Sequence, residues 1–286
     1  MAGKDSVTGI CALTLSQGAF VRSHLIPQAL ARIEPSNSPI ILLKGDEARP
    51  VRRWSGWYDE QLVTRAGEDI LARYDDWAIK FLRHHRLIWS SWESLSQPPP
   101  LDDNFGPFGI RVIENVEAEP LRLFFHSLLW RAAASSLPEF NSITLPDADM
   151  EILRVSLLTA GPVAEDFYPI SLMMFSTAAE AHIWAPETLM MPVIDDQGNQ
   201  VGERPIFRFC VDGLVVNFRR PVEECNQEDL ADCRLGNSSR LIIHSQPFDG
   251  SRQKKAMISD HSAAVARFPK EMHRFGVLAS PFSGRR

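Results

Sequence analysis

The sequence contains little that would place the chain in a membrane or in an oxidising compartment. It has only four cysteines and three tyrosines among 286 residues, and no apolar run approaches the ~20 residues that a membrane span needs. Residues 1–8 hold no apolar segment of the signal-peptide kind. We therefore expect a cytoplasmic protein with reduced thiols and no membrane partner. So few cysteines also exclude a small disulfide scaffold.

Charge of one sign is not in large excess. The formal net charge is −6, so the chain as a whole is not an obvious polyanion binder. The charge is uneven, because residues 240–286 hold nine Lys+Arg against three Asp+Glu, whereas residues 93–165 hold four against eleven. Hydrophobic residues make up 44%, which excludes a disordered chain. Basic regions that face a partner are expected in the C-terminal stretch and in short local clusters.

A proline-rich segment divides the sequence. Residues 94–107 are rich in proline, aspartate, asparagine and glycine, with consecutive prolines at 98–100. Proline fixes φ and removes a backbone donor, so the segment is predicted to be an extended linker. It separates an N-terminal module, residues 1–93, from a larger region, residues 108–286.

Hydrophobic periodicity predicts an α+β fold. In the first module, helices are expected at 25–33 and 65–89, and strands at 9–13, 19–23 and 39–43. In the larger region, helices are expected at 120–134, 147–160 and 252–268, and strands at 168–175, 181–184, 190–194, 205–211 and 214–218. The strands are predicted to form an antiparallel sheet.

Three blocks of sequence resemble a subgroup of the HNH endonuclease superfamily. In the first, Cys11 precedes Ser23-His24-Leu-Ile-Pro, where the family has Cys-x-x-Cys and then Ser-His-Ile-Ile-Pro. The second, residues 56–78, is similar to a Gly, a Cys-x-x-Cys-Glu element and Tyr-Glu-x-Tyr-Ala on one helix. The third, residues 127–132, looks like the family's Ser-x-x-Trp-Arg-Ala helix. The resemblance covers about residues 9–135 and implies an N-terminal ββα-metal-like module.

The family's structural zinc is not expected in this chain. The four positions that hold cysteines in the family are occupied here by Cys11, Thr14, Thr64 and Gly67. A tetrahedral zinc site needs four ligands, and a single thiolate does not provide one. Apolar packing is expected to stabilise the module instead, from the side chains of Phe20, Leu25, Leu62 and Ile70.

The resemblance also implies the chemistry of a metal-dependent nuclease. It assigns to His24 the role of general base, which removes a proton from the attacking water. The expected cofactor is Mg²⁺ or another divalent cation that stabilises charge on the phosphate. The expected metal site contains Glu68 and Asp75, which match acidic positions of the family. They are seven residues apart, so on a helix they share a face, where one carboxylate can bind metal and the other can orient His24.

Two basic clusters flank this site in the sequence. Arg49, Arg52 and Arg53 form one cluster, and Arg83 and Arg86 belong to the other. As nucleic-acid contacts they would bind phosphates with salt-sensitive affinity. Ordinary solvated surface charge is the alternative interpretation of both clusters.

Two functions remain open on the sequence alone. The first is a divergent HNH-like nuclease that hydrolyses phosphodiester bonds in DNA or RNA, of a kind that often belongs to mobile or host-defence loci. The second is an inactive descendant of that fold, which binds a protein partner as a regulatory module. The second is favoured by the loss of three zinc-ligand positions. It would leave His24 to pack the hairpin and Glu68 to interact with the helix dipole.

Overall fold

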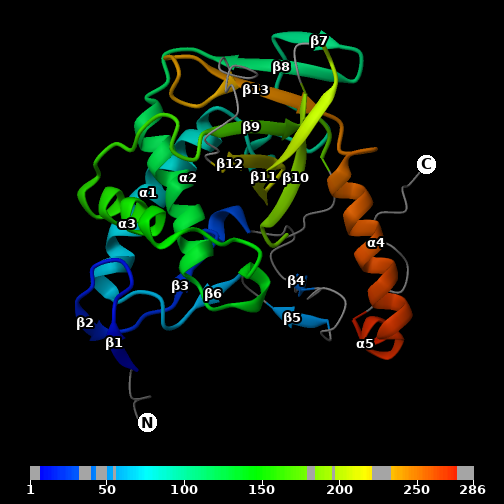
Figure 1. Cartoon of the computed structure of the whole chain (residues 1–286). Coiled ribbons are helices and arrows are strands. Elements are labelled where there is room, and N and C mark those ends of the chain that lie inside the picture. The colour runs from blue at the N-terminus through cyan, green and yellow to red at the C-terminus, as the bar shows by residue number, and fades with distance from the viewer. Residues whose placement is uncertain are drawn as a thin grey trace.

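A computed structural model describes residues 7–31, 40–42, 50–53, 56–178, 184–194, 197–220 and 233–275, with the backbone alone for 40–42, 51–53 and 194. The described chain has an α+β fold, as predicted. A seven-stranded sheet lies against a group of helices, and small two-stranded sheets lie beyond them (Figure 1). No helix in these residues has the length and apolar character that a membrane crossing requires.

The large sheet has the strand order β10-β11-β12-β9-β13-β8-β7. Its strands are β7 (Asp103–Phe105), β8 (Phe108–Ile113), β9 (Ile170–Phe175), β10 (Glu187–Ile194), β11 (Gln200–Val211), β12 (Leu214–Arg219) and β13 (Leu241–Gln246). The prediction of an antiparallel sheet is wrong at one pair, because β9 and β13 are parallel. Parallel neighbours need a long connection, and here the chain forms three antiparallel strands before β13 returns beside β9.

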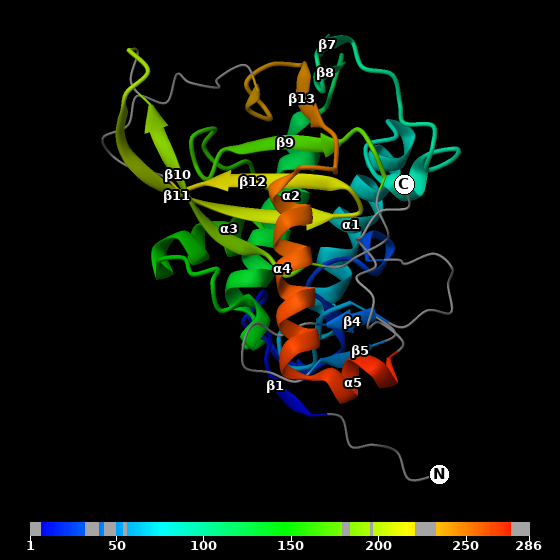
Figure 2. The same cartoon turned by 90° about the vertical axis from the view of Figure 1, so that its right-hand side faces the viewer.

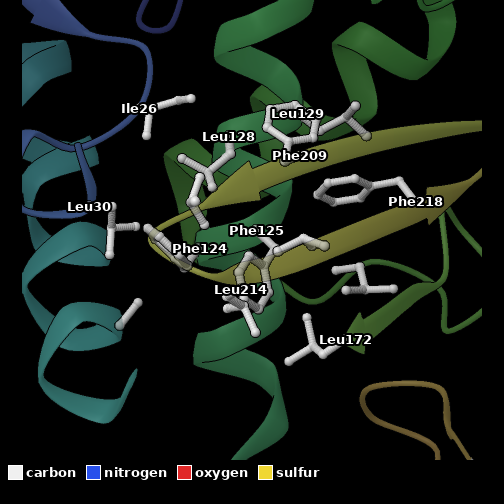
Figure 3. Packing of buried hydrophobic residues seen from close by; sticks show 14 of the residues in the cluster. Ile26, Leu30, Phe124, Phe125, Leu128, Leu129, Leu172, Phe209, Leu214 and Phe218 are labelled. Carbon is white, nitrogen blue, oxygen red and sulfur yellow. The ribbon is translucent and has the colours of Figure 1, made fainter. Parts of the chain in front are cut away.

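The inner face of the sheet packs against α2 (Ala118–Ala134). Alternate residues of the central strands are buried on this face, as period-2 strands require. Helix α2 is buried on all sides from Leu121 to Ala132, because the sheet covers one side and the N-terminal module covers another. Figure 3 shows Leu128 of α2 between Ile26 of the module and Phe209 of the sheet, and Phe124 of α2 beside Leu30 of the module.

Two further helices flank α2. They are α1 (Arg65–His84) and α3 (Asp147–Thr159), and the Tyr74 hydroxyl of α1 donates a 2.6 Å hydrogen bond to the Leu157 carbonyl of α3. Helix α1 ends before the predicted residue 89. Arg86 adopts a left-handed φ of 53°, and the Leu87 amide donates to the Leu82 carbonyl at 2.9 Å. This is the geometry of a Schellman end, which stops the helix.

Three short strands are predicted in the N-terminal module, whereas its described residues form six, each of two or three residues. They are β1 (Thr8–Ile10), β2 (Gln17–Ala19), β3 (Ser23–His24), β4 (Ile40–Leu42), β5 (Val51–Arg53) and β6 (Tyr58–Asp59). The predicted strand at 9–13 stops at Ile10 because residues 12–14 form a turn. The predicted helix at 25–33 is only a 3-10 turn, Gln28–Leu30, because Pro27 disfavours helical backbone at Ile26; residues 32 and 33 lie outside the described ranges.

One hydrophobic core runs across the predicted boundary at residue 93. A single cluster of buried side chains contains Leu25 and Leu82 of the module together with Leu128 of α2 and Phe209 of the sheet. Within the predicted linker, Asp103–Phe105 form β7 at the edge of the sheet. The two regions therefore share their interior.

The C-terminal part of the described chain is helical. Helix α4 (Arg252–Arg267) begins where the Ser251 hydroxyl accepts a 3.1 Å hydrogen bond from the Lys254 amide. It runs along the side of the molecule and is followed by α5 (Pro269–Arg274) (Figure 2). The predicted strand at 181–184 falls largely outside the described residues.

Candidate functional site

The four positions that correspond to the family's zinc ligands lie together in space. The Thr14 amide is 3.4 Å from Cys11 Sγ, and a Cβ built on Gly67 would lie 2.7 Å from the same sulfur. Thr64 also hydrogen-bonds to Cys11, and it forms a bridge with Phe20 after β2. The turn after β1 and the start of α1 therefore meet at Cys11, although the residues are more than 50 positions apart.

Apolar packing surrounds this junction. Leu25 and Leu62 are buried, as expected, and so is Cys11, whereas Phe20 and Ile70 are half-buried. Burial by itself would raise the pKa of the Cys11 thiol, but hydrogen bonds from Thr14 and Thr64 outweigh burial and lower it. With one thiolate at the junction, these residues do not fit a structural zinc ion.

Replacing Thr14, Thr64 and Gly67 together by cysteine is expected to create a zinc site with Cys11. The four positions already meet, and a Cβ at Gly67 requires that the Cys11 side chain change rotamer and that Val63, whose Cβ would lie 3.0 Å away, shift by a few tenths of an ångström. Zinc at 100 times its Kd should then stabilise the variant by about 2.7 kcal/mol. Zinc titration and zinc-dependent thermal unfolding measure the effect.

The matched control carries serine at the same three positions. Serine needs the same space for its Cβ at each position as cysteine but adds no thiolate, so unfolding of the control should not respond to zinc. Equal responses of the cysteine and serine variants would show that these positions do not have zinc-site geometry.

His24 lies on β3, which pairs with β6 opposite Tyr58. Its ring is half-buried and lies edge-on to the Tyr58 ring, with centroids 6.2 Å apart. Burial lowers the pKa of His24. The negative charge of Glu68 opposes this change, and the positive charges of Arg22 and Arg131 add to it. The imidazole is therefore neutral near pH 7.

Glu68 is in the first turn of α1 and acts electrostatically on His24. Its Oε2 atom is buried and has no hydrogen-bond partner among the described residues. A buried carboxylate oxygen without a partner is costly unless a ligand satisfies it. Glu68 is therefore the described side chain near His24 that best fits a divalent cation.

Asp75, the second predicted metal ligand, is bound by Arg131 of α2. Arg131 is 1% exposed, and its two terminal nitrogens donate to the two carboxylate oxygens of Asp75, one of them at 3.1 Å. Arg131 also donates to the His24 carbonyl at 3.1 Å and to the Ser127 hydroxyl at 2.9 Å. Arg131 thus links β3, α1 and α2. The Asp75 carboxylate is paired with the Arg131 guanidinium.

Other polar groups near β3 are already used or point elsewhere. Asp59 is buried opposite Ser23, and its two oxygens accept from the Gln61 amide at 2.8 Å and the Ser135 hydroxyl at 2.9 Å. Ser23 points away from His24, because neighbouring strand residues alternate. Across the described ranges, no group of three or more His, Cys, Asp or Glu side chains could hold a metal ion.

The predicted nucleic-acid contacts are only partly described. Arg49 lies outside the described residues, and Arg52 and Arg53 are described by their backbone in β5. Arg83 is exposed in the last turn of α1. Arg86 instead holds the chain after α1, since it donates to the Gln97 carbonyl at 3.0 Å and lies 3.8 Å from Glu93.

The structure adds Arg131 as a site residue; it belongs to the third block, but the resemblance assigns it no role in the site. The available signal was its position, because it is a charged residue inside an apolar helix. Such residues are rarely buried unless they are paired.

No protein-family model, curated protein or solved structure matches this chain. The geometry around His24 is therefore the main guide to function.

Proposed function

We propose that the chain is a metal-dependent nuclease that hydrolyses phosphodiester bonds in DNA or RNA, built on a divergent HNH-like module. One observation supports this most strongly: three separate blocks of sequence meet at His24. Glu68 and Asp75 come from the second block, and Arg131 comes from the third. The resemblance implies a histidine on the second strand of a hairpin that precedes a helix, whereas His24 lies on β3, which follows the β1–β2 hairpin and pairs with β6 before α1 begins.

In this proposal, His24 accepts the proton of the attacking water. Its lowered pKa keeps the ring neutral near pH 7, as a general base requires. Among the described residues, none is hydrogen-bonded to the ring, whose contact is with the Tyr58 ring. A ring nitrogen can therefore bind water directly.

Glu68 is the proposed ligand for Mg²⁺ or another divalent cation. Magnesium sites often use one or two carboxylates, with water and substrate phosphate completing the shell. A bound cation would stabilise negative charge on the phosphate and on the leaving oxygen. The unpartnered Oε2 atom of Glu68 fits this role, whereas the oxygens of Asp75 are occupied by Arg131.

Arg131 and Asp75 act in this proposal as positioning residues. Arg131 binds the His24 carbonyl, and the Asp75 carboxylate fixes the orientation of the guanidinium. Because Arg131 is also held by Ser127 on its own helix, the position of His24 is tied to α2. A base held in one place transfers protons more effectively than a mobile one.

Cleavage of nucleic acid tests the proposal. Supercoiled plasmid incubated with the full chain and Mg²⁺ or Mn²⁺ should be nicked, and EDTA should stop the reaction. Single-stranded DNA and structured RNA are included as substrates. Failure to cleave any of them with either metal would overturn the proposal.

A second function is favoured by a specific observation. The Asp75 carboxylate is neutralised by Arg131, as expected of a fold that has exchanged metal binding for an internal ion pair. The chain would then be an inactive HNH-fold descendant that binds a protein partner. Co-purification of a protein, with no salt-dependent binding to nucleic acid, would support this function. Binding of Mn²⁺ that requires Glu68 would count against it.

A further inference from the structure

The three cysteines in the described residues differ sharply in their surroundings. Cys11 and Cys210 are buried. Burial raises the pKa of Cys210 to about 11, and its thiol donates to the Gln253 side-chain carbonyl at 2.9 Å. Cys233 is instead half-buried. Accessible thiols near a base or a positive charge are the ones that react, whereas buried thiols are inert.

A histidine lies next to Cys233. Cys233 Sγ is 3.0 Å from His244 Nε2. A nucleophile and a base within this distance form the basic unit of thiol activation. His244 lies on β13 in the upper part of the large sheet, whereas β3 lies below the sheet (Figure 1), so this pair is separate from the proposed nuclease site.

The strand fixes the position of His244. Ile243 and Ser245 are buried on the inner face of the sheet, so His244 points to the opposite face, where it is exposed. It is paired on both sides, with Ile110 of β8 and Met173 of β9. Because β13 is paired on both sides, it holds the His244 imidazole in a fixed position beside the thiol. Solvent can reach this imidazole.

We propose that Cys233 is a nucleophilic thiol, activated by His244, that forms mixed disulfides with low-molecular-weight disulfides. His244 accepts the thiol proton, and the Cys233 thiolate attacks one sulfur of the small disulfide. The disulfide bond of the reagent breaks as a new one forms to Cys233. The Cys233 sulfur is oxidised, and the leaving sulfur is reduced. The departing thiolate takes the proton back from His244.

Mass spectrometry of the full chain with oxidised glutathione at pH 7 tests this proposal. Cys233 should gain one glutathionyl group. The rate should fall about three- to ten-fold in His244→Asn, because the thiolate fraction falls while the remaining thiolate is intrinsically more nucleophilic. His273→Asn is the matched control, since His273 is exposed on α5 and its replacement should leave the rate unchanged.

A second measurement needs no variant. Iodoacetamide should alkylate Cys233 faster in the folded chain than in the chain unfolded by urea, because only the folded chain places His244 beside the thiol. The buried Cys11 and Cys210 should show the reverse order. Slower labelling of Cys233 in the folded chain, or an unchanged rate in His244→Asn, would overturn the proposal. Neither result depends on nuclease activity.

Discussion

Replacing His24 by alanine is expected to lower the rate of metal-dependent plasmid nicking by about 10²- to 10⁴-fold, the usual contribution of a general base. The neutral ring is lost, and with it the proposed general base. The Glu68 carboxylate remains, so metal binding should persist while the chemical step slows. Initial rates with saturating Mn²⁺ measure the change.

His273→Ala is the control for this experiment. His273 is exposed on α5 and belongs to no part of the proposed site, so the variant should nick at the wild-type rate. Because His24 is half-buried, thermal unfolding of both variants is measured alongside. A folded His24→Ala chain that nicks DNA as fast as the wild type would remove His24 from the mechanism.

Replacing Asp75 by alanine is expected to destabilise the fold by about 3–5 kcal/mol. Arg131 is almost fully buried, with 1% of its side chain exposed, and Asp75 is its charged partner. Removing one partner of a buried pair leaves an uncompensated charge, which costs far more than the pair contributes. Urea unfolding of wild type and variant gives the difference in free energy of unfolding.

Asp69→Ala on the same helix is the matched control. Asp69 lies 3.9 Å from Arg65 in an exposed i,i+4 pair, which should contribute no more than about 0.5 kcal/mol. Adding Arg131→Met to Asp75→Ala should recover much of the loss, because an apolar side chain then replaces the unpaired charge. Equal effects of Asp75→Ala and Asp69→Ala would contradict the ion-pair interpretation.

The four long helices and strands β9 to β12 could be predicted from the sequence, whereas β8, β13 and several short strands could not. Strong periodicity predicts the first and last residues of α1, α3 and α4 to within a few positions. The exception is the C-terminal end of α1, where the left-handed Arg86 ends the helix earlier than predicted. Strands β8 and β13 were missed because arginine, histidine and serine interrupt their apolar runs. His244 faces outward, whereas Arg111 and Ser245 lie on the inner face, and the half-buried Arg111 donates to the Arg86 carbonyl at 3.3 Å. The parallel pairing of β9 with β13 depends on the long connection, which periodicity does not encode.

The candidate site was only half accessible to sequence reasoning. The resemblance selects His24, Glu68 and Asp75, because its motifs match residues by their order and spacing in the sequence. The partner of Asp75 is 56 residues away, on a helix whose apolar sequence indicates only burial. Which carboxylate meets a metal and which meets Arg131 depends on how α1 packs against α2. That choice is made by tertiary structure and not by spacing.

The shared core has a consequence for how such a chain can change over time. A small metal-stabilised module can be moved between proteins as a unit, because the metal supplies much of its folding energy. Here Leu25 and Leu82 are covered by the same interior as Leu128 and Phe209. Under the proposed HNH-like ancestry, the neighbouring helix and sheet would have supplied that stabilisation and relaxed selection to keep the zinc ligands. Such a module can no longer be transferred alone, because its stability depends on α2 and the seven-stranded sheet.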